Sequence, residues 1–510
     1  MSRTFRVVPL IAITGLLLAG CASAADGPGP AAGSSPSAGG EADTEASVHI
    51  QVGLEPTSMD VSTVSGAALE MLLIPNVYEG LVDSDGEGGF EPALASEWTM
   101  SEDGRVYDFT IRDDVSFHSG EPLTVDDVVW SFERAIADDS TNPDAGLMAD
   151  VESVVVDGDD GVTITLAKPD SEFLEALTSN AGIVFEEGST VDLANQTNGT
   201  GPYTLAQWNQ GSTASLARFD GYWGEPARNA EAVFHFMTDA TTAATALQAG
   251  EIDILTSSTA ETTPLFEGDD GFTITEGDSR SWMTLGINHA AEPLDDVRVR
   301  QALRQAIDKD GLIQVLGGQA VRIGSMAGPS DPWYEDLTDI DAYDPENARE
   351  LLAEAGAENL ELTMRVSNTY DSRISEYIAA QLGEVGVTVN IEQLEFSTWL
   401  EDVFQGKDYE LSMVLHVAPA LAKNYSNAEY YWNYDDATAQ QLAADAKVAT
   451  SADERNALLA DLARHISEQA ASDWLYSPVA KVVARAGVSG FPVDGLANRM
   501  PVSGIEIAAQ

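Results

Sequence analysis

A single cysteine, Cys21, occurs in this chain of 510 residues, and its position limits what can hold the fold together. No cysteine follows it, so disulfide bonds cannot stabilise the folded part, and buried apolar surface must do so instead. From Val48 to the end the composition is ordinary, and 44% of the whole chain is hydrophobic. That length exceeds what one hydrophobic core serves, so we predict two or three lobes, each with its own core.

The residues before Cys21 have the layout of an export signal. Arg3 and Arg6 precede an apolar run, Val7–Ala19, that is too short to cross a bilayer as a stable helix. The sequence Leu-Ala-Gly-Cys ending at Cys21 resembles the bacterial lipobox, in which the cysteine thiol is lipidated and the preceding residues are removed. The alternative is an ordinary secretory signal that happens to contain a cysteine. We predict a lipoprotein, with residues 1–20 as its signal peptide.

Residues 21–47 are rich in Ala, Gly, Ser and Pro, so we predict a disordered tether there. No long apolar stretch follows, which indicates an extracytoplasmic chain that is anchored to the cell membrane by a lipid on Cys21 and does not span it. The net charge of −59 argues against nucleic-acid binding, because phosphates would be repelled. The acids are spread along the whole chain, which favours a solvated acidic surface over steering of cationic ligands.

Strand and helix signals alternate along the chain and predict a layered α/β fold. Thr124 precedes an Asp-Asp pair and an apolar face, as a helix N-cap does. Asp295-Asp296 is expected to open a long helix that runs through Ile307 and carries a cationic rim. Two further helices are expected, one over Ala240–Ala249 that stops at Gly250 and one that opens at Asp344-Pro345 and ends at Gly356. The predicted strands are Val48–Leu54, Val106–Arg112, Val162–Ala167, Ala232–Met237, Leu360–Val366, Val387–Leu394 and Leu411–His416.

A series of short motifs follows the tether. One of them, Gly199-Thr200-Gly201-Pro202-Tyr203, lacks the Gly-Lys-Ser/Thr ending of a phosphate loop, so we expect a tight turn beside an interdomain strand. His118, in a Phe-His-Ser-Gly turn, is expected to be a satisfied turn residue and no metal ligand. The other motifs are Asn76-Val77-Tyr78-Glu79-Gly80-Leu81-Val82, Pro92-Ala93-Leu94-Ala95, Ser101-Glu102-Asp103-Gly104, Gly221-Tyr222-Trp223-Gly224, Leu247-Gln248-Ala249-Gly250-Glu251-Ile252-Asp253, Pro293-Leu294-Asp295-Asp296-Val297-Arg298-Val299-Arg300 and Tyr343-Asp344-Pro345.

In this order and at these distances, the motifs resemble the dipeptide, oligopeptide and nickel class of extracytoplasmic solute-binding proteins, family 5. The resemblance covers nearly all of the chain after the tether. It implies a periplasmic-binding-protein-like fold (type II, cluster C): two lobes that close by hinge bending around a ligand in the cleft between them. Lobe I would comprise residues 48–75, 199–280 and 478–510. Residues 76–198 would form an inserted domain II, and residues 281–477 would form lobe III.

Motifs for catalysis are missing from the sequence. It contains no Gly-x-Ser-x-Gly, His-Glu-x-x-His or Cys-x-x-Cys pattern, and its six histidines are scattered singly without zinc-ligand spacing. We therefore expect no enzyme, no cofactor and no resident metal. A hydrolase whose parts assemble only in three dimensions, and a purely structural surface lipoprotein, remain alternatives.

The resemblance also implies positions for the ligand. Ser65-Gly66 fall where the ligand loop of lobe I is expected, and Trp282-Met283 fall where an aromatic wall is expected. Arg373 matches a position at which peptide receptors place an arginine facing the ligand carboxylate, which suits the two parallel donors of a guanidinium. Its alternative is a surface arginine on a helix.

One departure from the family pattern concerns His416. Peptide receptors of this family usually carry a tryptophan there and then an aspartate for the free amino terminus, but here no acid follows until Glu429. A buried ammonium without a carboxylate is costly, so a free-amine peptide is in doubt unless Asp371 supplies the charge. Tyr425 and Phe396 complete the predicted binding residues. The cluster Tyr430, Tyr431, Trp432 and Tyr434 would either stack on sugar rings or pack in the core.

We therefore predict a monomeric receptor that captures a small solute, foremost a di- or oligopeptide, and delivers it to an ABC permease and its ATPase. The runner-up ligands are a nickel chelate, an oligosaccharide or an opine-like compound.

Overall fold

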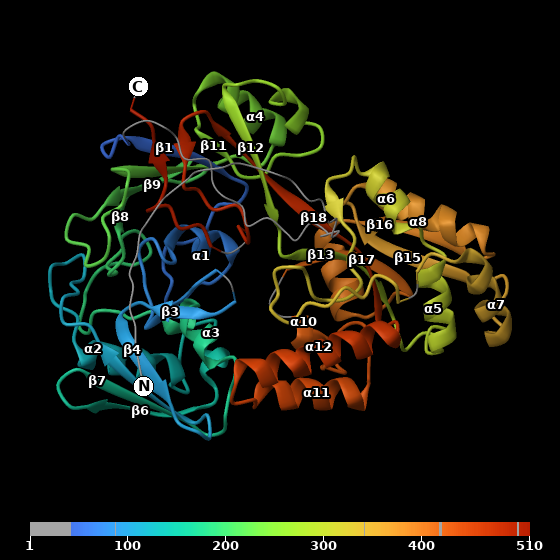
Figure 1. Ribbon diagram of the computed structural model, residues 1–510, viewed down its shortest axis with the longest axis horizontal. Helices are drawn as coiled ribbons and strands as arrows, with labels where there is room; N and C mark the ends of the chain where they lie inside the picture. Colours follow the sequence, from blue (N-terminus) through green and yellow to red (C-terminus); the bar gives the residue numbers. More distant parts are fainter. Residues whose placement is uncertain (1–41, 87, 341, 418–420, 497–498, 510) are drawn as a thin grey trace, which may run out of the picture. The chain divides into compact units, whose positions relative to one another are not determined.

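The computed structural model describes residues 42–86, 88–340, 342–417, 421–496 and 499–509 (Figure 1). The predicted signal peptide, Cys21 and most of the predicted tether lie outside these residues, as do residues 418–420 of the segment that follows His416. Strands and helices alternate along the described chain, so the predicted α/β class is confirmed.

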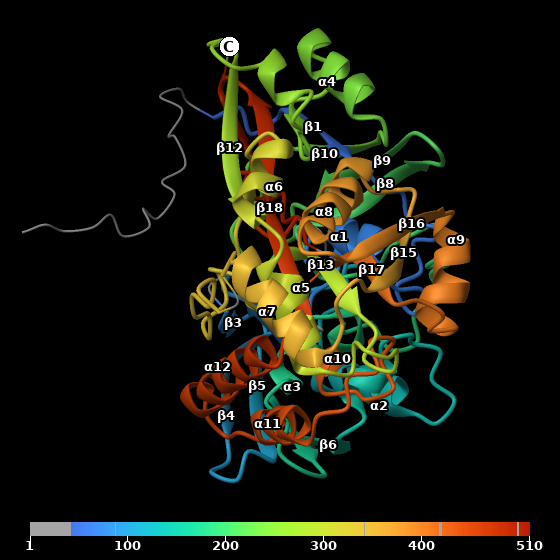
Figure 2. The ribbon, with the colours of Figure 1, turned by 90° about the vertical axis from the view of Figure 1, so that its right-hand side faces the viewer.

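The largest sheet has twelve strands in the order β16-β15-β17-β13-β18-β11-β1-β10-β9-β8, and β12 and β14 also pair with β18 (Figures 1 and 2). Its strands are β1 (Ser47–Val52), β8 (Tyr203–Asn209), β9 (Thr213–Arg218), β10 (Glu231–Phe236), β11 (Ile254–Leu255), β12 (Phe272–Asp278), β13 (Ser281–Ile287), β14 (Ala320–Val321), β15 (Glu361–Ser367), β16 (Thr388–Leu394), β17 (Leu411–Val417) and β18 (Ser472–Arg485).

Strand β18 joins the two halves of this sheet because it changes partner along its 14 residues. Its first part pairs with β13, up to Tyr476 opposite Met283. Its second part pairs with β12, from Val479 opposite Asp278. Between the two parts, Ser477 and Pro478 pair with the short β14. The break between β12 and β13 falls beside this point and includes Arg280, whose φ is 49°.

A separate four-stranded sheet, β4-β5-β7-β6, is built from the part of the chain predicted as the insert. Helix α2 packs on it, and Thr124 and Asp127 form a reciprocal capping box at the start of that helix. Two short hairpins, β2-β3 and β19-β20, accompany the sheets. The strands are β2 (Val82–Ser84), β3 (Phe90–Pro92), β4 (Ala95–Met100), β5 (Val106–Ile111), β6 (Val151–Asp157), β7 (Gly161–Leu166), β19 (Val488–Ser489) and β20 (Glu506–Ile507).

Apolar side chains form a separate core at each group of elements. One core surrounds β1 and β10, a second fills the four-stranded sheet, and others lie on the two faces of β13. The α-helices are α1 (Ala67–Leu73), α2 (Val125–Ile136), α3 (Phe173–Leu177), α4 (Ala240–Ala249), α5 (Val297–Gln305), α6 (Lys309–Val315), α7 (Pro345–Ala355), α8 (Ser372–Glu384), α9 (Phe396–Trp399), α10 (Leu421–Tyr425), α11 (Ala437–Lys447) and α12 (Ala452–Glu468). Short 3-10 helices cover Ala145–Met148, Asn180–Gly182 and Thr263–Leu265, and a π-helix covers Leu400–Gln405.

The seven predicted strands are all present, within a residue or two of the expected bounds. The helix ends at Gly250 and Gly356 are also confirmed, since both glycines have left-handed backbone. The long helix expected from Asp295-Asp296 is wrong: α5 ends at Gln305. Asp308 then accepts a hydrogen bond from the backbone N–H of Gly311 and caps a second helix, α6, so the chain turns at Ile307.

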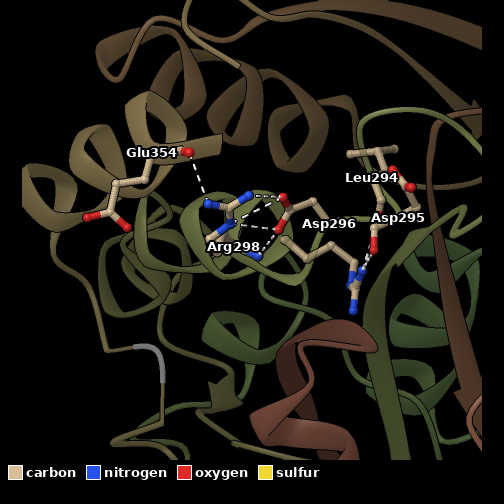
Figure 3. Close-up of polar contacts among 6 residues, drawn as sticks. Leu294, Asp295, Asp296, Arg298 and Glu354 are labelled. Atoms are coloured by element: carbon tan, nitrogen blue, oxygen red, sulfur yellow. Dashed lines mark hydrogen bonds and ion pairs between the residues drawn. The ribbon is translucent and has the colours of Figure 1, made fainter. Parts of the chain in front are cut away.

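The cationic rim expected on α5 is only half correct. Figure 3 shows the Arg298 guanidinium between the Asp296 carboxylate and the backbone carbonyl of Glu354. Arg300, by contrast, is 5% exposed and donates to the backbone carbonyls of Leu294 and of residues 295, 469 and 470. Burial lowers the pKa of Arg300. This arginine therefore ties the start of α5 to the end of α12 and does not face solvent.

Several of the motifs singled out in the sequence meet where the segment predicted as the insert joins the main sheet. The buried carboxylate of Glu79 accepts hydrogen bonds from Thr200 Oγ1 at 2.8 Å, Tyr222 Oη at 2.9 Å and Trp223 Nε1 at 3.0 Å. Burial raises the pKa of Glu79, and these three bonds offset part of that rise. Three neutral donors from two other motifs thus satisfy one buried acid.

His118 belongs to the same junction. Its Nδ1 accepts from the Gly199 N–H at 3.1 Å, and its Nε2 bonds the Gly201 carbonyl at 3.0 Å. Both ring nitrogens therefore have backbone partners, as expected of a satisfied turn residue. Gly199 has no room for a side chain, because a Cβ there would lie 1.9 Å from the carbonyl oxygen of Val77.

Candidate ligand-binding site

Trp282 and Met283 begin strand β13, and neither side chain is open to solvent. They are 2% and 4% exposed and point to opposite faces of the sheet, as neighbours in a strand must. Met283 packs in the core with α5, α7 and α8, whereas Trp282 packs in an aromatic core on the other face. The indole N–H of Trp282 has no hydrogen-bond partner among the residues that the structure describes. In this conformation neither residue forms an open wall.

His416 lies directly opposite Trp282 in the antiparallel pair β13-β17, so both belong to the same face of the sheet. Its ring lies edge-on to Trp432 at 5.2 Å between centroids. Burial lowers the pKa of His416 to about 4, and no charged group adds to that shift. The imidazole is therefore neutral at pH 7, and no carboxylate among the residues that the structure describes pairs with it.

Tyr425 is fully buried and stacks on Trp432, with ring centroids 4.3 Å apart. Three of the four aromatic residues that were considered for sugar stacking are also buried: Tyr431 at 1%, Trp432 at 0% and Tyr434 at 5% exposure. This favours the packing alternative for them. The structure thus brings Trp282, His416 and Tyr425 into one aromatic core.

Arg373 lies in the first turn of helix α8 and is half exposed. Its guanidinium binds the carboxylate of Asp371, with Nε 2.8 Å and Nη2 2.5 Å from Oδ2. Nη2 is also 3.9 Å from Oε1 of Glu261, which lies in the predicted lobe I. Asp371 caps the same helix through the Arg373 backbone N–H, and its hydrogen bonds to Arg373 lower its pKa. The predicted ligand arginine and the predicted substitute acid are thus paired with each other.

Two aromatic residues that the sequence did not single out lie beside this pair. The hydroxyl of Tyr370 accepts from the backbone N–H of Leu415 at 3.1 Å, one residue before His416. Burial raises the pKa of Tyr476, and the charges of Asp371 and Tyr370 raise it further. The position of Tyr370 directly before the helix cap Asp371 was a signal that pointed to it.

Of the remaining predicted residues, Ser65 and Gly66 lie apart from the aromatic core, whereas Phe396 lies at its edge, because Trp399 belongs to that core. Ser65 is half-buried and Gly66 is exposed at the start of α1, where Gly66 donates to Glu70 Oε1 at 3.2 Å. Phe396 is 45% exposed and stacks on Trp399, with ring centroids 6.0 Å apart. No described contact connects Ser65, Gly66 or Phe396 to Arg373 or His416.

Within the ranges that the structure describes, no three His, Cys, Asp or Glu side chains are grouped to hold a metal ion. The same residues include no helix with the length and apolar character needed to traverse a bilayer.

These observations agree with the comparisons with known proteins. The profile of the bacterial extracellular solute-binding proteins, family 5 Middle, matches residues 89–438. The dipeptide-binding protein of Escherichia coli (strain K12) is 30% identical over 386 residues, which cover 68% of this chain and 72% of that protein. The nickel-binding periplasmic protein of the same strain is 26% identical over 474 residues, which cover 84% and 89% of the two chains.

Solved structures confirm the predicted periplasmic-binding-protein-like fold. The structure of HbpA2 from Haemophilus parasuis covers 91% of this chain and 100% of its own, with a TM-score of 0.81 and 22% sequence identity. CtaP from Listeria monocytogenes covers 92% and 100%, also with a TM-score of 0.81, at 21% identity. The fold is that of a two-lobed extracytoplasmic binding protein. The chain belongs to the bacterial extracellular solute-binding proteins, family 5.

Proposed function

We propose that this chain is the solute receptor of an ABC importer, which captures a peptide by hinge closure and passes it to a membrane permease. The observation that carries the proposal is the match of the family profile to residues 89–438 together with the dipeptide-binding relative at 30% identity. The relatives above are named as binding proteins, which supports a role in which no bond is made or broken.

The proposed hinge lies where β18 changes partner. Lobe I is assigned to residues 48–75, 199–280 and 478–510, the inserted domain II to 76–198 and lobe III to 281–477. The boundaries at 280 and 478 are supported by the break between β12 and β13 and by the switch of β18 from β13 to β12. A small rotation there moves large parts of each lobe with little change elsewhere.

The proposed contact residues from lobe III are Arg373, Phe396, His416 and Tyr425, with Trp282 and Met283 behind them, and lobe I contributes Ser65 and Gly66. Arg373 is the member whose charge and exposure suit direct contact with a solute. The buried members Trp282, Met283 and Tyr425 pack against other residues of lobe III, so parting of the lobes alone would not uncover them.

A nickel chelate is the second candidate ligand. The nickel-binding relative aligns over most of this chain, and a neutral imidazole at His416 is the protonation state that metal binding requires. An oligosaccharide or an opine-like compound is a further alternative.

A thermal-shift screen of the purified chain across peptides, sugars and metal chelates tests the ligand class. A solute that binds only the folded form raises the unfolding midpoint as its concentration rises. If the ligand is a peptide, di- or oligopeptides should raise the unfolding midpoint. If only nickel–histidine raises it, the ligand is a nickel chelate and the peptide proposal is wrong. Incubation with the same peptides, followed by mass spectrometry, should show no cleavage products.

The lipid anchor is proposed from the sequence around Cys21 alone. Cells expressing the chain should incorporate radiolabelled palmitate into it, and the Cys21→Ser variant should lose the label and leave the membrane fraction. Label that persists in the variant would contradict the proposal.

A further inference from the structure

Domain II and lobe III touch each other at a site remote in sequence from the predicted ligand residues. The backbone N–H of Ser171 donates to the Lys447 carbonyl at 2.7 Å, and Ser171 Oγ donates to the Ala446 carbonyl at 2.9 Å. Lys447 is the last residue of α11, and the final carbonyls of a helix have no partner within the helix. Ser171 therefore caps the C-terminus of a helix that belongs to the other half of the molecule.

Opposite charges surround this cap. Lys447 Nζ is 3.4 Å from Asp170 Oδ2 and 3.6 Å from Asp150 Oδ2, and both acids come from domain II. Cations near a helix C-terminus are favourable, and here the cation also finds two carboxylates across the contact. Burial lowers the pKa of Lys447, but Asp170, Glu172 and Asp150 outweigh that effect and raise it overall.

A further ion pair and two close approaches of the chain extend the contact between domain II and lobe III. Arg455 of α12 is 3.7 Å from Glu175 of α3. Gly104, with φ +67°, lies so close to lobe III that a Cβ on it would be 3.0 Å from Thr450 Cγ2. A Cβ on Gly88 would likewise be 3.2 Å from the ring of Pro332.

We propose that this contact is a latch: residues 169–175 of domain II hold the α11–α12 turn of lobe III and keep the lobes closed before any solute binds. The inference rests on the proposed hinge, since only lobes that move apart need a latch. The population of the closed state also sets the affinity for the solute. A solute that binds the closed form binds more tightly when contacts within the protein already favour that form.

Two lysines that share one acid provide a matched test. Lys447 and Lys168 both bind Asp150, but Lys168 lies in domain II itself, with Nζ 3.4 Å from Asp150 Oδ1. Lys447→Glu puts a third acid against Asp150 and Asp170 and should raise the ratio of open to closed molecules about tenfold. Lys168→Glu makes the same change of charge without crossing between lobes, so it should leave that ratio unchanged.

The ratio is measured by pulsed electron spin resonance on the full chain in the absence of solute. Spin labels are placed on Val155→Cys and Glu350→Cys, both at exposed positions on opposite sides of the contact, in a Cys21→Ser background. We expect one short distance between the spin labels in the wild-type protein. In the Lys447→Glu variant we expect a second, longer distance as well. Identical distance distributions for the two lysine variants would overturn the latch.

A charge swap keeps the proposal testable if Lys447→Glu fails to fold. Arg455→Glu should open the lobes, and adding Glu175→Arg should close them again. No rescue by the double variant would count against the latch. Because no solute is present, these outcomes are independent of the thermal-shift screen, which tests the receptor function on its own.

Discussion

Replacement of Gly199 by alanine should destabilise the protein strongly, because the close approach of Gly199 to Val77 and Tyr78 leaves no space for a methyl group. A Cβ at this position would lie 1.9 Å from the Val77 carbonyl oxygen and 2.9 Å from Tyr78 Cδ1. The two segments would have to part by roughly 1.5 Å to reach ordinary contact distance.

Such a movement strains three hydrogen bonds at once. They run from His118 N to Gly199 O (2.9 Å), from Gly199 N to His118 Nδ1 (3.1 Å) and from Gly201 N to Val77 O (3.0 Å). At about 1 kcal/mol for each bond, with overpacking of about 1–3 kcal/mol, the expected loss is about 4–6 kcal/mol. That is a large share of the stability of a typical protein.

Thermal unfolding followed by circular dichroism measures the effect, with Gly383→Ala as the matched control. Gly383 lies in helix α8, and a Cβ placed on it would have no atom within 4 Å. Alanine at this position should therefore stabilise the folded protein by about 0.5–1 kcal/mol. Gly199→Ala should lower the midpoint by about 5 °C or more. A midpoint within about 1 °C of the wild type would refute the structural role assigned to the Gly-Thr-Gly motif.

Three other predictions concern charge. Asp371→Asn keeps a capping oxygen on α8 but frees Arg373, so calorimetry should show tighter binding of an anionic solute and weaker binding of a cationic one; no change for either would remove the pair from the site. The pKa of His416 is lowered to about 4, below its ordinary 6.5, so the unfolded chain takes a proton first as the pH falls. Stability should therefore drop by roughly 3 kcal/mol between pH 6.5 and 4, and His416→Phe should lessen this drop in urea titrations at both pH values. Arg300→Lys should lower the unfolding midpoint, since one ammonium cannot serve four backbone carbonyls, whereas exposed Arg298→Lys should leave the midpoint nearly unchanged.

Local signals in the sequence predicted seven of the strands and several helix ends. The strands were found because their apolar residues alternate or run together, and the caps at Thr124 and Asp344 were found because their side chains bond the next turn of backbone. Strand β18 was missed although it joins the two halves of the large sheet. It contains Pro478, and a proline argues against a central strand. The structure accommodates this proline at the place where β18 passes from one partner strand to the next.

The candidate site was less predictable, because burial is a property of the whole fold. The sequence indicated aromatic residues at Trp282, His416 and Tyr425, but it could not reveal that they pack against one another. Nor could spacing show that the guanidinium of Arg373 also approaches Glu261, since that residue lies on a distant segment. The family resemblance indicated which positions could contact a ligand. Tertiary contacts determine which atoms at those positions are accessible to solvent.

The late position of β18 also has a consequence for biogenesis. Residues 472–485 supply the strand to which both halves of the large sheet are bonded, and Asn76 bonds the backbone of Met500 and Val502 still further along. Residues 472–485 must therefore be made before either half can complete its hydrogen-bonded ladder. Pairing between such distant segments delays folding, so the large sheet is among the last parts of the molecule to form.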